Sequence, residues 1–147
     1  MMDARTETLR QALAARDIDR LLDMVPFAKF LGLVPEWDGD DLLLLMPMRE
    51  RLIGNPMLPA LHGGAVGALL ESAAIFKLMC EVDPPQVPKI INITVDYLRS
   101  GRPKHTRART MITKQGRRVA NVQVRAFQDD ESSPIAVAHA HFLLRSC

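Results

Sequence analysis

Aromatic residues are scarce in this sequence, whose 147 residues include five phenylalanines, one tyrosine and one tryptophan. Proteins that bind single-stranded nucleic acids stack bases on aromatic side chains that alternate with basic ones. The basic residues of this chain are not interleaved with aromatics in that way. We therefore expect no nucleic-acid partner.

Cysteines and long apolar runs are also rare. Of the two cysteines, Cys80 falls in an apolar segment and the other is the last residue, which is not the pattern of a disulfide framework. Residues 1–7 are charged and lack the apolar core of a signal peptide. The longest apolar run, residues 65–80, carries two charges and is shorter than the roughly 20 residues that span a bilayer. These features predict a cytoplasmic protein without membrane contact.

Acidic residues are missing from one long segment. Residues 97–128 contain no Asp or Glu but hold nine Lys and Arg residues. Such one-sided charge favours an anionic ligand, although the same cations could be solvent-facing residues on strands. The composition leaves both interpretations open.

The rest of the composition is that of a globular protein, with 48% hydrophobic and 24% charged residues. We expect one domain over residues 1–147, made of an N-terminal helical cover (1–32) and a core (33–147).

Helical spacing over residues 3–24 predicts an amphipathic helix, within which Asp17 could cap a second piece. Pro26 should end or kink it, before a further turn closed by Gly32.

Alternation of apolar and polar residues predicts six strands. On the strand 90–98, Ile91, Ile93, Val95 and Tyr97 should share one face. Neighbouring strands along the chain imply an antiparallel sheet, and hence the α+β class with a central helix against one sheet face. Residues 49–61 should form a loop, and the strands 90–98, 106–113 and 118–128 should be linked by hairpins. The other predicted strands are 33–37, 41–48 and 135–144.

The central helix, about residues 63–80, is apolar all round and should be buried on most faces. Glu71 lies in its middle, and a buried carboxylate costs several kcal/mol unless it is paired or protonated. A functional role would explain its presence. The alternative is that Glu71 binds a backbone donor or an arginine across an interface.

The helix begins with His62-Gly63-Gly64. Amide groups in a first helical turn have no partners within the helix, and the macrodipole adds positive charge there. These amides could polarise a carbonyl oxygen, as in an oxyanion hole, or His62 could simply cap the helix. Gly63 and Glu71 are separated by about 12 Å along one helix. If both act on one carbonyl, it must lie between antiparallel helices of a two-fold dimer.

Other chemistry has less support in the sequence. His139 and His141 point the same way on a strand, but no third ligand with suitable spacing is evident, so we expect no metal and no cofactor. Ser72 has no evident base, and apolar surroundings should raise the pKa of Cys80.

The sequence resembles the hotdog-fold acyl-CoA thioesterases of the phenylacetate-pathway and 4-hydroxybenzoyl-CoA branch, from about residue 25 onward. The residues that carry the resemblance are Asn55, the segment 61–64, Glu71 and the strand segment 94–101. It implies a curved antiparallel sheet wrapped around one helix, in a homodimer or homotetramer. The position of Glu71 is often Asp in relatives. Asn55 stands one residue further from His62 than the corresponding asparagine does in relatives.

By the same resemblance, Glu71 is the catalytic carboxylate and acts as general base or nucleophile on an acyl-CoA thioester. Gly63 of the partner subunit would polarise the carbonyl with its amide. His62 and Asn55 would hold the thioester and the water, and Gly64 would contact substrate. Relatives often have Ser or Thr early in the strand after the helix, a role that Thr94 could take here.

Coenzyme A carries phosphates that guanidinium groups bind well. Arg99, Arg102, Arg117 and Arg118 are expected at strand ends or turns, where they could make such contacts. The sequence therefore predicts hydrolysis of small or medium acyl- or aryl-CoA. A non-catalytic acyl-CoA-binding domain and a hydratase or dehydratase on the same fold are the alternatives.

Overall fold

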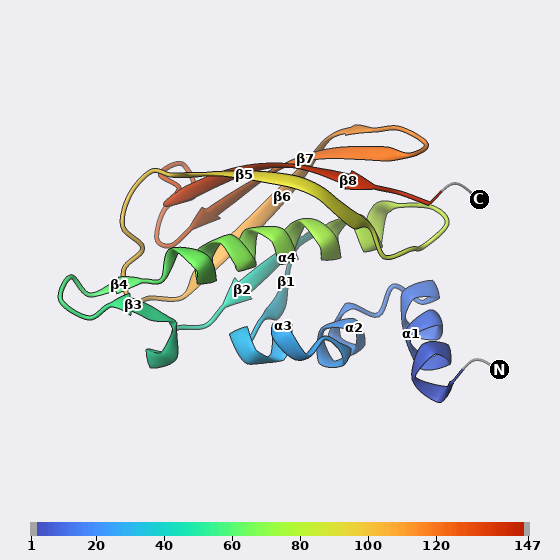
Figure 1. Cartoon of the computed structure of the whole chain (residues 1–147), viewed down its shortest axis with the longest axis horizontal. Helices are drawn as coiled ribbons and strands as arrows, with labels where there is room; N and C mark the ends of the chain where they lie inside the picture. The colour runs from blue at the N-terminus through green and yellow to red at the C-terminus, as the bar shows by residue number, and fades with distance from the viewer. Residues whose placement is uncertain (1–2, 146–147) are drawn as a thin grey trace.

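The computed structural model describes residues 3–145 and places a long helix, α4 (Gly63–Glu81), across the inner face of a six-stranded antiparallel sheet (Figure 1). Small and apolar side chains of β7 and β8, such as Val122, Val124 and Phe142, pack beneath the helix and are fully buried. The predicted α+β class is confirmed. The spatial order of the strands is β1 (Val34–Asp38), β2 (Asp41–Met46), β6 (Thr106–Gln115), β7 (Val119–Phe127), β8 (Ala136–Leu143) and β5 (Lys89–Tyr97).

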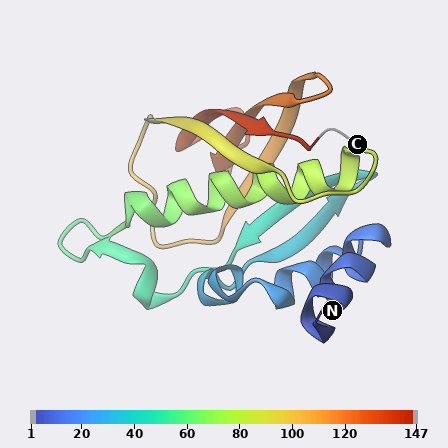
Figure 2. The same ribbon diagram turned by 45° about the vertical axis from the view of Figure 1, so that its right-hand side comes forward.

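Strand β5 does not form a hairpin with β6, and that prediction is wrong. It pairs with β8 instead and lies at the edge of the sheet. The connection to β6 crosses the end of the sheet beside the start of α4 (Figure 2), where the Leu61 amide donates to the Gly101 carbonyl at 2.9 Å. This non-local contact holds the connection away from a tight turn.

A β-bulge also changes the face of one predicted residue. The register of β5 against β8 shifts between Ile90 and Asn92. As a result Ile90, Ile93, Val95 and Tyr97 oppose the inward-facing residues of β8, whereas Ile91 was predicted on that face. Ile91 lies in the bulge and is 55% exposed.

Three short helices form the N-terminal region: α1 (Ala4–Ala14), α2 (Ile18–Met24) and α3 (Pro26–Leu31). Asp17 caps α2 by accepting a hydrogen bond from the Arg20 amide at 3.1 Å, as the sequence predicted. Gly32 ends α3 in the left-handed conformation with φ 72°, which favours glycine. Buried side chains of all three helices join the main core.

The predicted loop 49–61 contains structure of its own, and that prediction is wrong. It forms the 3-10 turn η1 (Glu50–Leu52) and a small hairpin of β3 (Ile53–Asn55) and β4 (Ala60–Leu61). The hairpin packs closely on the start of α4, because a Cβ on Gly54 would lie 2.7 Å from the His62 Cα. Only glycine fits this contact.

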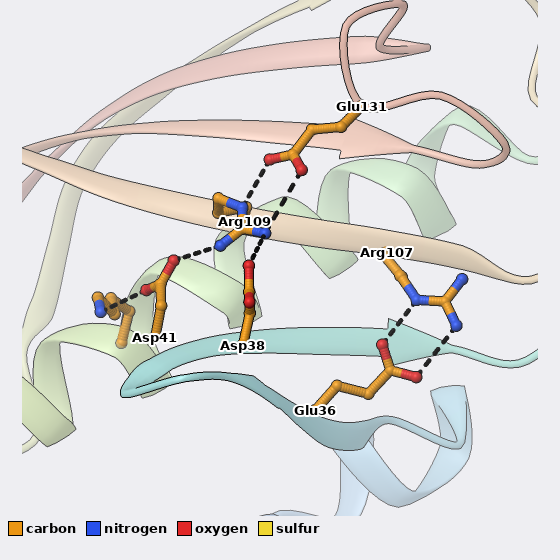
Figure 3. A network of polar contacts seen from close by, with 7 residues as sticks. Glu36, Asp38, Asp41, Arg107, Arg109 and Glu131 are labelled. Carbon is orange, nitrogen blue, oxygen red and sulfur yellow. Dashed lines mark hydrogen bonds and ion pairs between the residues drawn. The ribbon is translucent and has the colours of Figure 1, made fainter.

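The basic segment is partly neutralised by acids that are distant in sequence (Figure 3). Arg107 binds Glu36 at 2.6 Å, and Arg109 binds Asp41 at 2.5 Å and Glu131 at 2.6 Å. A 3.0 Å contact to Asp38 completes the Arg109 cluster, and Lys104 pairs with Asp129. These cations are structural, so the interpretation of the whole segment as an anion-binding surface is wrong for them.

Lys77 extends this network into the core. Lys77 lies on α4 and is only 9% exposed. Its ammonium group donates to Asp41 at 2.7 Å and to Glu81 at 2.9 Å. Burial raises the pKa of Asp41, but hydrogen bonds from Lys77 and Arg109 outweigh it, so the net pKa is lowered. A carboxylate with a lowered pKa stabilises the fold above its unfolded-state pKa, and the contribution is lost as the pH falls through the folded-state value.

Replacing Lys77 by Met is expected to lower the free energy of unfolding by about 1–3 kcal/mol at neutral pH, because two charge-assisted hydrogen bonds from a nearly buried donor are lost. With one donor gone, the folded-state pKa of Asp41 should move back toward its ordinary value of about 4. The loss of stability below that pH should then be smaller than in the wild type. Chemical denaturation at several pH values measures both effects.

The matched control is Arg10→Met, which removes an exposed pair with Glu7 on α1. Exposed pairs contribute little to stability. If Lys77→Met were as stable as this control, the assigned role of the network would be wrong.

Helix α4 is longer than the apolar run predicted from the sequence. By length and composition it could cross a membrane, but half of its most apolar window is buried inside the protein. The core helix of a globular protein can have the same length and the same apolar composition.

Candidate active site at the start of the central helix

His62 caps the start of α4 and leaves one amide free. Its Nδ1 accepts a hydrogen bond from the Gly64 amide at 2.9 Å, and its own amide donates to the Leu52 carbonyl at 2.8 Å. Within residues 3–145, no acceptor is found for the Gly63 amide, which lies in the exposed first turn. The two interpretations of His62-Gly63-Gly64 therefore coexist, since the histidine is a cap and Gly63 offers an unpaired donor.

Tyr97 fixes this first turn from the end of β5. Its hydroxyl donates to the Gly63 carbonyl at 2.7 Å. A Cβ placed on Gly63 would lie 3.5 Å from the tyrosine ring, and one on Gly67 would lie 3.2 Å from the hydroxyl. The side chain of Tyr97 thus lies over two glycines that are one helical turn apart.

Glu71 lies on a half-exposed strip of α4, not in the core. Gly67, Ala68, Ser72 and Ile75 flank it and are also half-buried. Among the described residues, the Glu71 carboxylate has no hydrogen bond or ion pair. The expectation of a fully buried carboxylate is wrong for the single chain, because one side of α4 is left uncovered by its own fold (Figure 1).

The structure does not bring Glu71 and Gly63 of one chain together. They are eight residues apart on one continuous helix, which is about 12 Å along the axis. Asn55 ends β3, next to the Gly54 contact with His62, and its Oδ1 accepts from the Met57 amide at 3.0 Å. Thr94 lies opposite His139 on the outer face of the sheet, away from α4.

The four arginines predicted to bind phosphates fall into two groups. Arg99 lines a pocket of about 310 Å³ together with Gly63 and Tyr97, and the exposed Arg102 follows in the same connection. Arg117 and Arg118 line a pocket of about 710 Å³ beside the residues that follow α4. The groups therefore sit at opposite ends of a helix that is about 28 Å long. None of the four has an ion pair among the described residues.

Other reactive groups are poorly placed for chemistry. Burial raises the pKa of the Cys80 thiol, which disfavours the nucleophilic thiolate. His141 binds Asn92 at 2.6 Å on the outer face of the sheet, and His105 accepts from the Met48 amide. No group of three His, Cys, Asp or Glu residues within 3–145 is arranged to hold a metal ion.

Comparison with known families decides the class of this protein. The family described as acyl-CoA thioesterase N-terminal domain matches residues 54–143, which is more than half of the chain and includes α4 and the strands that follow it. The chain belongs to this acyl-CoA thioesterase family. The protein is thus a thioester hydrolase with the hotdog fold, as the sequence predicted.

Solved structures of bacterial proteins resemble the thioesterase over most of its length. A Chromobacterium violaceum protein is 38% identical, with 95% of this chain and 97% of that one covered and a TM-score of 0.76. A Pseudomonas aeruginosa protein is 26% identical, with 90% and 99% covered and a TM-score of 0.78. A Haemophilus influenzae thioesterase is 20% identical, with 88% and 90% covered and a TM-score of 0.76, a likeness that shows the fold alone. No curated protein matches the chain.

Sequence reasoning about the thioesterase missed the contact made by Tyr97. The available signals were the only tyrosine of the chain, on the apolar face of its predicted strand, and two glycines spaced by four residues. Their contact required the position of β5 beside α4, which the hairpin prediction did not give.

Proposed function

We propose that this thioesterase hydrolyses small or medium acyl- or aryl-CoA thioesters at a site shared by two subunits. Glu71 of one subunit would act as general base or nucleophile, and the amide of Gly63 of the partner subunit would polarise the carbonyl. The observation that carries the proposal is the pair of unpaired groups, the Gly63 amide and the Glu71 carboxylate, on one helix at a separation that no single carbonyl can bridge.

A two-fold arrangement of antiparallel α4 helices satisfies this geometry. It would place the strips around Glu71 face to face, and the small residues Gly67 and Ala68 would let the helices approach closely. The edge strand β5 is open along one side and exposes Ile91. An unpaired edge readily joins a second sheet. We propose a homodimer, which could pair again into a tetramer.

The chemistry follows from the groups around the carbonyl. The Gly63 amide, supported by the helix dipole, would stabilise the negative charge that develops on the carbonyl oxygen. His62 uses Nδ1 as an acceptor, so its neutral ring carries the proton on Nε2 and can donate to the thioester or the water. Asn55 keeps its amide NH2 for the same purpose, since only its oxygen is used in the turn. Gly64 would line the site through its backbone.

The same two-fold axis would bring the two arginine groups to one side of the site. With Gly63 of one chain opposite the partner's Glu71, the end of the partner's α4 would lie about 15 Å beyond the start of this chain's α4. Arg99 and Arg102 beside that start, and the partner's Arg117 and the partner's Arg118 beside that end, could then bind different phosphates of one extended coenzyme A. Thr94, on the outer face of the sheet, stays a prediction of the family resemblance.

The test is release of free thiol from a panel of acyl- and aryl-CoA esters by the full-length protein. Thiol release with saturation kinetics supports the proposal. Binding of the esters without turnover would indicate a binding domain, and conversion of enoyl-CoA without thiol release would indicate a hydratase. Either of these results would overturn it.

Tyr97→Phe is expected to lower kcat by about 2- to 10-fold, because the Gly63 carbonyl loses one hydrogen bond of ordinary strength and the first turn of α4 is held less firmly. Tyr97 is a positioning residue in this proposal, so KM should change less than kcat. Steady-state kinetics with one good substrate measure the two parameters. A rise in KM at unchanged kcat would contradict the assignment.

A further inference from the structure

An apolar pocket lies between the N-terminal helices and the second half of α4. Its volume is about 290 Å³, and its wall includes Leu9 of α1, Leu21 and Met24 of α2, Met79 of α4, and Val25 and Val87. The lining contains aliphatic side chains and thioethers, with no aromatic ring and with polar residues only from the start of α1. Such a pocket suits a flexible aliphatic group better than an aryl ring.

The pocket is aligned with Glu71 along the helix. Glu71, Ile75 and Met79 follow one another at intervals of four residues and form one ridge of α4. Ile75 is half-exposed on the open strip, whereas Met79 is buried in the pocket wall. Glu71 and Met79 are separated by about 12 Å along the axis.

We propose that this pocket receives the far end of the substrate's acyl chain. The inference rests on the proposed function, because it takes the thioester carbonyl to lie at Glu71. An extended chain advances about 1.2 Å per bond, so roughly ten bonds are needed to reach Met79. The geometry thus assigns a straight, saturated acyl group of medium length as the preferred substrate class.

The chain-length dependence of kcat/KM tests the assignment. Each methylene that enters an apolar pocket should raise kcat/KM by about fourfold. In the wild type this rise should extend over the lengths that reach the pocket, about eight to twelve carbons. Leu9→Trp, which fills the pocket from α1, should abolish the rise at these lengths and leave butyryl-CoA hydrolysis unchanged.

Two further variants keep the test decisive. Met24→Trp fills the same pocket from α2 and should act like Leu9→Trp if one of the two folds poorly. Leu13→Trp adds the same bulk one turn further along α1, outside the pocket lining, and should keep the wild-type profile. Thermal unfolding of each variant shows which of them are folded.

The outcomes separate this inference from the proposed function. A wild-type preference for aryl- or short acyl-CoA overturns the pocket assignment and leaves the thioesterase proposal standing. If Leu9→Trp and Met24→Trp kept the wild-type dependence of kcat/KM on chain length, the pocket assignment would be overturned as well. Absence of thiol release with every ester would overturn the proposed function itself, and this inference with it.

Discussion

Replacing Glu71 by Gln is expected to reduce kcat for acyl-CoA hydrolysis by about 10²- to 10⁴-fold, which is the usual contribution of a general base. Glutamine keeps the size of the side chain but can neither accept a proton from water nor attack the thioester as a carboxylate. The carboxylate has no hydrogen bond or ion pair among the described residues. The fold should therefore be unaffected. Thiol release and thermal unfolding, measured on the same preparation, check both statements.

Ser72→Ala provides the matched control for this variant. Ser72 is adjacent to Glu71, is equally half-buried and has no proposed role. Its loss should leave kcat within about twofold of the wild type, as expected for a substitution away from the reacting atoms. Wild-type activity of Glu71→Gln would contradict the proposed mechanism.

Gly63→Pro is expected to lower kcat by about 10²- to 10³-fold, the cost of removing one oxyanion-hole donor. Proline removes the amide proton without disturbing the helix, since the first helical position tolerates it. His62 already has an extended ψ of 129°, as a residue before proline requires. Gly63→Ala keeps the amide, and its Cβ would make an ordinary 3.5 Å contact with Tyr97. The alanine variant should retain most of the activity.

Mixing the two inactive variants tests whether the site is shared. A heterodimer of Glu71→Gln and Gly63→Pro chains has one site with an intact carboxylate and an intact amide, each from a different chain. Random pairing in equal amounts should restore roughly a quarter of wild-type activity. Denaturation and joint refolding allow the chains to exchange. A site formed within a single chain would give no recovery.

Local signals predicted much of the fold. The apolar run after two glycines gave α4 nearly to its ends, and Asp17, Pro26 and Gly32 marked the ends of the N-terminal helices correctly. These features depend on residues only a few positions apart, so the sequence displays them directly.

Contacts between distant segments were not predictable in the same way. The pairing of β5 with β8 depends on how the connection after β5 is held, and the hydrogen bond between Leu61 and Gly101 joins residues forty positions apart. The role of Arg107 and Arg109 likewise depends on acids from β1, β2 and the loop before β8. Charge counted along the chain does not reveal such pairing.

The identity of the site residues stays a prediction, and the structure shows an environment that the sequence did not predict. Glu71, Gly63 and His62 were selected for the chemistry that their residue types allow, and the structure gives their positions. The burial of Glu71 was inferred from apolar neighbours, but a helix apolar on all sides needs a cover on each side. One chain supplies only part of that cover.

Strand β5 carries Tyr97, whose hydroxyl binds the carbonyl of Gly63, the residue whose amide, in the proposed dimer, serves the neighbouring chain's carboxylate. In a dimer with a β5 substitution in only one chain, the reaction would slow at the opposite subunit's Glu71, while the altered chain's own Glu71 would be served by an intact neighbour. The strand acts in trans.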